Sequence, residues 1–432
     1  MKYCDICASA QYLYTTSLDF EELKIMKRRI FAATMLVALL VLGGCDKTPA
    51  TPEQEKPQPE QPDKPDQPEK PDQPDKPSEE AGLDENNCII FKDDVLEKAI
   101  LSYKTPIDTD GDGKISLDEA RAVKELDLGF EQAQEGGAEL VGNVSALKYF
   151  TSLEVLNLRY HKVSDATPIE SLSNLKTLVL IGNPIPKLDT SKLGELSILR
   201  LSDTDISEIN IANTPKLTQL YLSRTKVSSV DLSTLPLLEE AVLNECPNLT
   251  KMNANGLQNV TRIDAVASGI ASASFTDCPL LSQIHLDSNE LESIELKKLP
   301  LLIVLNIYGN KLTSLDVTDL PYLLRLYIHE NKIAKLDVSQ NLHLREIIAS
   351  GNLFEEADFS NNEEITHVEL QNMPNLKVIN LKNLAYDQYA SSYLIASGNT
   401  ALQKVITDPG AEYEAVKAIF KDNPNVTVTT QL

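Results

Sequence analysis

The residues with the most distinctive chemistry are oxygen donors that recur at short intervals between positions 108 and 119. Carboxylates stand at the first, third and fifth places of this stretch, and a glycine at the sixth place permits a sharp turn. A hard cation such as Ca²⁺ takes about six to eight oxygen ligands. The spacing therefore predicts a calcium site made by Asp108, Asp110, Asp112, the Lys114 carbonyl, Ser116 (directly or through a water) and a bidentate Glu119.

This stretch resembles the calcium loop of the EF-hand, because its turn glycine, its apolar Ile115 at the eighth place and its closing acid all agree. Apolar residues at helical intervals predict a helix from Asp93 to Tyr103 and the start of another from Leu117 to Lys124. Since there is only one such loop, we do not expect a cooperative sensor. Because calcium is abundant outside cells, we expect a permanently bound structural ion. The alternative is an acidic turn that binds no ion.

The element that must position any other site is a repeat of 21 or 22 residues. Eleven units follow the pattern L-x-x-L-x-L-x-x-N-x-L, as from Leu302 to Leu312, with other apolar residues at some leucine places and with Asn at the ninth place in five units. One unit cannot bury its own apolar side, so stacked units are expected to bury it together. Asparagine at the ninth place is expected to bond backbone groups of adjacent turns. The units begin at Leu153, Leu175, Leu196, Leu217, Leu238, Val260, Leu281, Leu302, Leu323, Leu344 and Ile365.

This pattern resembles the leucine-rich repeat. The resemblance implies an α/β repeat solenoid, a horseshoe of 21–22-residue units with a parallel β-sheet on its concave face. Units this short leave little room for a convex helix, so the return segments are predicted to be extended or 3₁₀. The EF-hand-like segment and a strand from Lys124 to Leu128 are predicted to cover one end. A strand from Leu402 to Thr407 and a helix from Glu412 to Lys421 are predicted to cover the other.

The N-terminal region has the features of an export signal followed by a tether. A basic stretch after Met26 precedes an apolar run from Ile30 to Leu42, which is shorter than the roughly 20 residues of a spanning helix. Leu42-Gly-Gly-Cys45 resembles the lipobox of bacterial lipoproteins, which implies lipidation of Cys45; the alternative is an uncleaved anchor. Proline at every third position from Pro59 to Pro77 predicts an unfolded, semi-rigid stalk.

The whole layout resembles bacterial leucine-rich-repeat surface lipoproteins with internalin-like caps. The resemblance implies a location in the bacterial cell envelope, with the outer membrane facing the cell surface as the expected site. The predicted organisation is a dispensable or untranslated extension (1–25), a signal peptide (26–44), the lipidated cysteine with its linker (45–81), the N-terminal cap (82–128), the repeats (129–384) and the C-terminal cap (385–432).

Side chains at the third, fifth and seventh places of each repeat are expected to point away from the core, onto the concave face. In repeats seven to eleven these places are rich in Tyr, His and Arg, and Tyr and Arg dominate binding hot spots. The alternative is a β-surface that favours Tyr by propensity alone. The predicted ligand-binding residues are His285, Asp287, Asn306, Tyr308, Arg325, Tyr327, His329, Ile348 and His367.

Composition and motifs narrow the function class. The chain has 40 basic and 64 acidic residues, a formal charge of −24, which argues against a nucleic-acid partner. No nucleophile lies in a strained glycine turn and no phosphate loop occurs, so we expect no enzyme. The expected function is protein recognition or adhesion, on a host or bacterial surface. The alternatives are a glycan-binding accessory of nutrient uptake and an envelope scaffold.

Two further columns recur in the sequence. Acids at 21-residue intervals on the return segments could face solvent at turns or hold cations; they are Glu295, Asp316, Asp337 and Asp358. Cys246 and Cys278 are expected inside the solenoid as small apolar residues.

Overall fold

The computed structural model describes residues 80–131, 139–385 and 393–431. These residues belong to one compact unit that begins at Glu79. The predicted signal peptide, Cys45 and nearly all of the stalk lie outside the described residues. Within the described ranges, no helix has the length and apolar character needed to cross a membrane.

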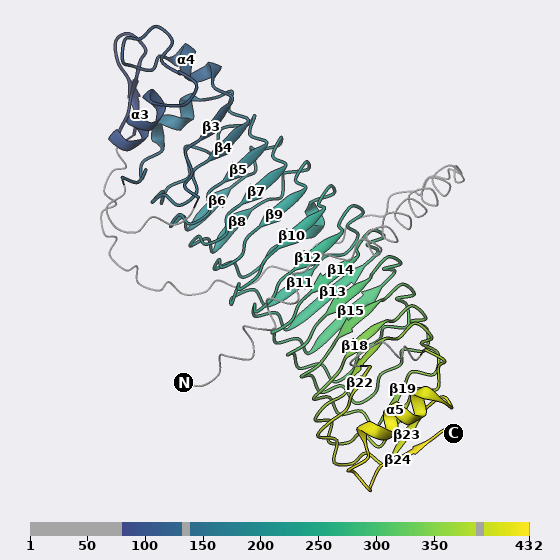
Figure 1. Ribbon diagram of the computed structural model, residues 1–432. Coiled ribbons are helices and arrows are strands. Elements are labelled where there is room, and N and C mark those ends of the chain that lie inside the picture. The colour runs from purple at the N-terminus through teal and green to yellow at the C-terminus, as the bar shows by residue number, and fades with distance from the viewer. Residues whose placement is uncertain (1–79, 132–138, 386–392, 432) are drawn as a thin grey trace, which may run out of the picture. The chain divides into compact units, whose positions relative to one another are not determined.

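The solenoid is built on one parallel sheet to which each turn adds a short strand (Figure 1). The strands stay in register, so that Leu305 pairs with Ile284 on one side and Leu326 on the other. The predicted parallel sheet and its 21-residue spacing are confirmed. In spatial order its strands are β3 (Glu125–Asp127), β4 (Val155–Asn157), β5 (Thr177–Val179), β7 (Ile198–Arg200), β9 (Gln219–Tyr221), β10 (Glu240–Val242), β12 (Arg262–Asp264), β14 (Gln283–His285), β16 (Val304–Asn306), β17 (Arg325–Tyr327), β18 (Glu346–Ile348), β20 (His367–Glu369) and β22 (Leu394–Ile395).

The return segments form smaller parallel sheets, as expected for units too short to hold a helix. Most return segments are extended, and one contains the 3₁₀ turn η2 (Leu232–Thr234). Both forms were predicted. The return strands are β6 (Lys187–Asp189) with β8 (Glu208–Asn210); β11 (Lys251–Asn253), β13 (Ser272–Thr276) and β15 (Ser293–Lys297); and β19 (Glu356–Asp358), β21 (Val378–Asn380), β23 (Lys404–Ile406) and β24 (Thr427–Thr429).

The ninth-place asparagines join neighbouring turns inside the core. The Asn331 side chain is 4% exposed; its amide nitrogen donates to Ile307 O (2.9 Å) and Ile328 O (3.1 Å), and its oxygen accepts from Leu312 N (3.0 Å). The same three-bond pattern recurs at Asn310. The predicted role of this amide is confirmed, because each one satisfies backbone groups that are buried away from water.

The N-terminal cap closes the first turn with a hairpin and two short helices. The hairpin pairs β1 (Gly82–Leu83) with β2 (Ile89–Ile90). Helix α3 (Asp94–Leu101) begins where the Asp93 carboxylate accepts from the Val95 and Leu96 amides, and α4 (Leu117–Ala122) begins at the capping box of Ser116 and Glu119. The 3₁₀ turn η1 (Ser145–Tyr149) lies beside α4.

The C-terminal cap consists of helix α5 (Ala411–Ile419), close to its predicted range, and the edge strand β24, which was not predicted. The repeat array also extends past its predicted end at residue 384. Strand β22 pairs with β20 in the long sheet, and Asn399 bonds Leu370 O (2.7 Å) as the earlier ninth-place asparagines do. Tyr393, which was placed in the predicted C-terminal cap (385–432), is therefore the buried start of a further turn.

Candidate functional sites

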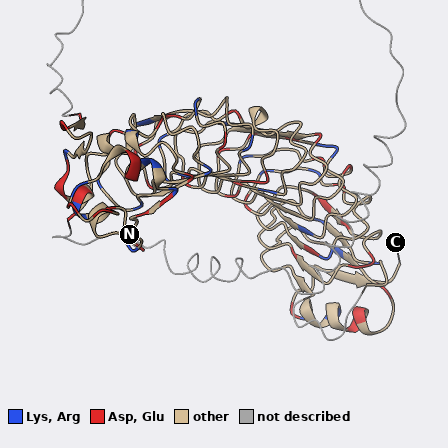
Figure 2. Ribbon diagram, turned by 90° about the horizontal axis from the view of Figure 1, so that it is seen from above, with Lys and Arg blue, Asp and Glu red and all other residues tan. Residues whose placement is uncertain are grey.

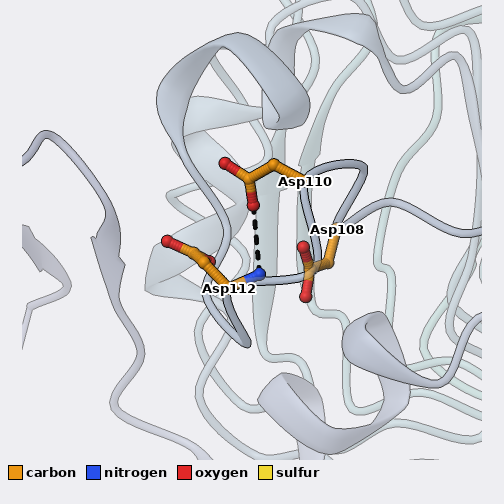
Figure 3. Close-up of side chains that lie close together, drawn as sticks. All are labelled: Asp108, Asp110 and Asp112. Atoms are coloured by element: carbon orange, nitrogen blue, oxygen red, sulfur yellow. Dashed lines mark hydrogen bonds between the residues drawn. The ribbon is translucent and has the colours of Figure 1, made fainter.

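The predicted calcium loop brings its three aspartates together (Figure 3). One carboxylate oxygen from each of Asp108, Asp110 and Asp112 lies within 4.8 Å of the others. Calcium binds oxygen at about 2.3–2.6 Å, so oxygens that share one ion lie at most about 5 Å apart. The three carboxylates therefore fit a calcium ion. They are the only acidic group of this kind in the described part of the chain.

The loop holds these carboxylates with its own backbone. Asp108 accepts from Gly111 N (2.7 Å) and Gly113 N (2.9 Å), and Asp112 N donates to Asp110 (3.1 Å), the bond drawn in Figure 3. Gly111 and Gly113 have φ of 76° and 81°, where a side chain is strained. The glycine pattern thus provides the turn that makes the carboxylates converge.

Both carboxylate oxygens of Glu119 accept hydrogen bonds from residues of the loop. One of its oxygens accepts from Thr109 N (2.6 Å) and Thr109 Oγ1 (2.9 Å), and the other accepts from Ser116 N (2.9 Å) and Ser116 Oγ (2.8 Å). Burial disfavours the charge, but these donors outweigh it and lower the pKa of Glu119 to about 2. Glu119 is ionised and closes the loop, and its bidentate ligation stays a prediction, as does ligation by Ser116 and Lys114.

The loop is joined to the hairpin strand β2 by a backbone hydrogen bond. Ile115 is 1% exposed and its carbonyl accepts from Ile89 N (2.8 Å) in β2, while Lys114 Nζ contacts Asp84 at 2.7 Å. The incoming helix α3 lies within its predicted range of Asp93 to Tyr103 and ends at Leu101, several residues before the loop. The loop is therefore held by a hairpin and the following helix.

The predicted ligand-binding residues lie on the outer surface of the long sheet, here called the sheet face. Their register places them in columns, as when His285, Asn306, Tyr327 and Ile348 follow one another across adjacent strands. Most are half-buried, because close strand spacing crowds the surface.

A connected set of contacts runs through the middle of this patch. The Asp287 carboxylate accepts from Asn306 Nδ2 (2.9 Å) and from the Tyr308 hydroxyl. The Tyr308 ring stacks on His329, with centroids 4.2 Å apart and planes 12° from parallel. Burial raises the pKa of Asp287 to about 6, against the effect of the Tyr308 bond, and burial lowers the pKa of His329 to about 4. At neutral pH the carboxylate is therefore ionised and the imidazole neutral.

The structure corrects part of the expected surface. Tyr327 and Ile348 were expected to face outward as ligand-binding residues, but Tyr327 is 8% and Ile348 6% exposed. The Tyr327 hydroxyl donates to Glu346 (3.0 Å), which also faces Arg325 (3.6 Å). Tyr308 pairs with His329 because these two side chains share a column.

Two acidic residues belong to this surface although they were not predicted as site residues. Glu346 is bonded to Tyr327, and Glu369 lies near His367 (3.9 Å) and Ser350 Oγ (3.4 Å). Both occupy the third or fifth place of their repeats, so their outward direction was available from the sequence.

The return-segment acids cap turns. Asp316, Asp337 and Asp358 each accept from the backbone amide two residues later, at 2.9–3.0 Å. Glu295 instead contacts Lys297 and Ser274. These bonds favour the solvated-turn interpretation over cation binding. Cys246 and Cys278 are buried, as expected.

Comparisons with solved structures identify the fold and nothing finer. A functional domain of InlJ from Listeria monocytogenes, described as including a cysteine ladder, aligns with a TM-score of 0.52 at 19% identity, over 73% of this chain and 74% of that one. An internalin (inlF) from the same organism gives 0.50 at 18%, over 79% and 96%. The APL1 leucine-rich repeat domain gives 0.51 at 18%, over 73% and 82%.

No family model matches the sequence, and no curated protein matches it. The similarity is distant and structural, so it shows a leucine-rich-repeat solenoid that resembles those of internalins.

Proposed function

We propose that the chain is a lipid-anchored protein of the bacterial cell envelope whose sheet face, at repeats seven to eleven, recognises a protein on a host or bacterial surface. Lipidation of Cys45 would supply the membrane attachment, with the outer membrane as the expected location. The proline-rich segment would hold the solenoid away from the lipid.

The main observation in support of the proposal is the set of connected contacts from Asp287 through Tyr308 to His329. A bond at its hydroxyl and a stacked imidazole at its ring hold Tyr308 in one orientation. Binding a partner then costs little additional side-chain entropy, which is what a hot-spot residue requires. An outward strand position that serves solubility alone needs no such contacts.

A protein partner is better supported than a glycan. Sugar rings pack on open aromatic faces, whereas His329 covers one face of Tyr308, and Tyr327 is 8% exposed. The half-buried mixture of Tyr, Arg, His and Ile matches the composition of protein–protein hot spots.

We also propose that Asp108, Asp110 and Asp112 hold a structural calcium ion, with Glu119, Ser116 and the Lys114 carbonyl as the remaining predicted ligands. The ion would neutralise three converging carboxylates and fix the loop against β2 and α4. It would supply no reactive group, since its part is to stabilise the cap that covers the first repeat.

The test compares binding by the full chain and by a Tyr308→Ala/His329→Ala variant, in calcium, to extracts of host and bacterial surfaces. The matched control is Tyr322→Ala/His343→Ala. It removes a second stacked Tyr–His pair (5.6 Å, 11°), whose residues stand just before the first leucine of their repeats and outside the sheet-face columns. Equal unfolding midpoints would show that both variants fold.

We expect the sheet-face variant to lose at least about tenfold in affinity for the captured protein and the control variant to lose none. Equal capture by all three chains would contradict the proposed patch. Release by monosaccharides would favour the glycan alternative, and co-purification with other envelope lipoproteins regardless of variant would favour a scaffold.

A further inference from the structure

The sheet face divides into two parts of different charge. The outward places of repeats one to four carry Arg159 and Arg200 and no acidic residue, in a chain with 64 acids. From repeat five onward the same places carry Glu240, Asp264, Asp287, Glu346 and Glu369. Because Glu125 and Asp127 of β3 lie beside repeat one, the locally cationic and apolar part of the face is the stretch from β5 to β9.

Arg200 differs from the other arginines of this face. Arg159 pairs with Glu131, Arg262 with Asp264 (2.6 Å), and Arg325 faces Glu346 (3.6 Å). In the described part of the chain, Arg200 has no carboxylate partner. Its buried Nε lacks an acceptor, as does the Nε of Arg159. Its guanidinium lies 5.0 Å from the ring centre of Tyr221.

The surroundings of Arg200 are fixed and largely apolar. In the register of the sheet it stands between Val179 and Tyr221, and Ile198 lies two residues before it on the same face. The Tyr221 hydroxyl donates to Glu240 (2.6 Å), which holds the ring beneath the guanidinium. A guanidinium on an aromatic face, among half-buried aliphatic residues, binds a carboxylate more strongly than one in open water does.

We propose that Arg200, with Val179, Ile198 and Tyr221, is a second contact for the protein partner and receives an aspartate or glutamate side chain that aliphatic residues flank. This inference rests on the proposed function, that the sheet face binds a protein. A phosphate is disfavoured because the other arginine of this region, Arg159, is already paired with Glu131.

The second contact would fix the direction in which the partner lies. Arg200 is on the third repeat and Tyr308 on the eighth, so strands about 4.8 Å apart place them roughly 24 Å from each other along the sheet. The partner is expected to present an acidic, aliphatic segment at one end of this span and its main contact at the other.

The test follows the arginine Nε–Hε signals of the full chain by NMR while 4-methylpentanoate is added, with 4-methylpentanamide as the uncharged probe of the same shape. We expect the acid to shift the Arg200 signal, identified by its loss in Arg200→Lys, and the amide to leave it in place. Ile198→Ser is expected to weaken binding of the acid at least about threefold, whereas Arg345→Gln, at an arginine paired with Glu364, leaves the affinity for the acid unchanged.

Equal shifts from acid and amide, or an acid shift as large at Arg262 and Arg325 as at Arg200, would overturn the inference. The Tyr308→Ala/His329→Ala variant should titrate as the unaltered chain does. Loss of capture by that variant with no shift at Arg200 would refute the second contact alone. A shift at Arg200 with undiminished capture would refute the patch at repeats seven to eleven alone.

Discussion

Replacement of Asn331 by alanine is expected to destabilise the solenoid by about 3 kcal/mol. The substitution leaves the buried Leu312 amide without its acceptor, which costs about 1–3 kcal/mol. Ile307 O and Ile328 O each lose one bond, worth about 1 kcal/mol, but each keeps the amide of a neighbouring asparagine, Asn310 or Asn352. The sharing of carbonyls therefore limits the loss.

Asn331→Thr is the matched variant, because the chain itself uses threonine at this place. Thr204 Oγ1 donates to Leu201 O and Thr225 Oγ1 to Leu222 O, both at 2.7 Å. Threonine should therefore keep one of the three bonds, and its loss should fall between zero and that of alanine. The exposed Asn361, with a single bond of 3.4 Å, provides a control for replacement by alanine.

The assay is equilibrium urea unfolding followed by far-ultraviolet circular dichroism, since the chain has no Trp for fluorescence. We expect stability to fall in the order unaltered chain, Asn331→Thr, Asn331→Ala, with Asn361→Ala close to the unaltered chain. A loss for Asn331→Ala below about 0.5 kcal/mol, the usual range of surface changes, would refute the reasoning. A threonine variant less stable than the alanine variant would refute it too.

Two more predictions concern charge. Calorimetric calcium titration of the full chain should show binding that Asp110→Asn weakens at least about tenfold and the exposed Asp118→Asn does not; absence of binding by the unaltered chain would contradict the site. The raised pKa of Asp287 means that the folded state holds this proton more tightly, so the resulting stability is full below pH 3.8 and lost as the pH rises through about 6. About two pKa units correspond to roughly 3 kcal/mol. Asp287→Asn should therefore be more stable than the unaltered chain at neutral pH, and this difference in the free energy of unfolding should disappear in acid. Unfolding of both chains across pH measures it. A difference that does not change with pH would contradict this cause.

The repeat pattern was sufficient to predict most of the fold. Leucines at fixed places predicted the register in which Leu305 lies between Ile284 and Leu326, because each turn has the same length and buries the same places. The asparagine bonds followed from the need to satisfy buried backbone groups. The further turn at β22 was missed because its spacing from the preceding strand departs from 21 residues.

The calcium loop was predictable in its residues and less so in its geometry. Local spacing placed Asp108, Asp110 and Asp112 together, since the glycine turns between them are local. The bonds from Thr109 and Ser116 to Glu119 depend on where α4 begins relative to the loop. The pairing of Ile115 with Ile89 depends on a hairpin far earlier in the chain.

The sequence by itself determined which side chains face outward, since alternation along a strand needs no partner to specify it. The tertiary structure decided which of them meet. Tyr308 contacts His329 and Asp287, Tyr327 is buried against Glu346, and the Arg200 guanidinium lies near the Tyr221 ring. These contacts depend on column, twist and side-chain length across neighbouring turns.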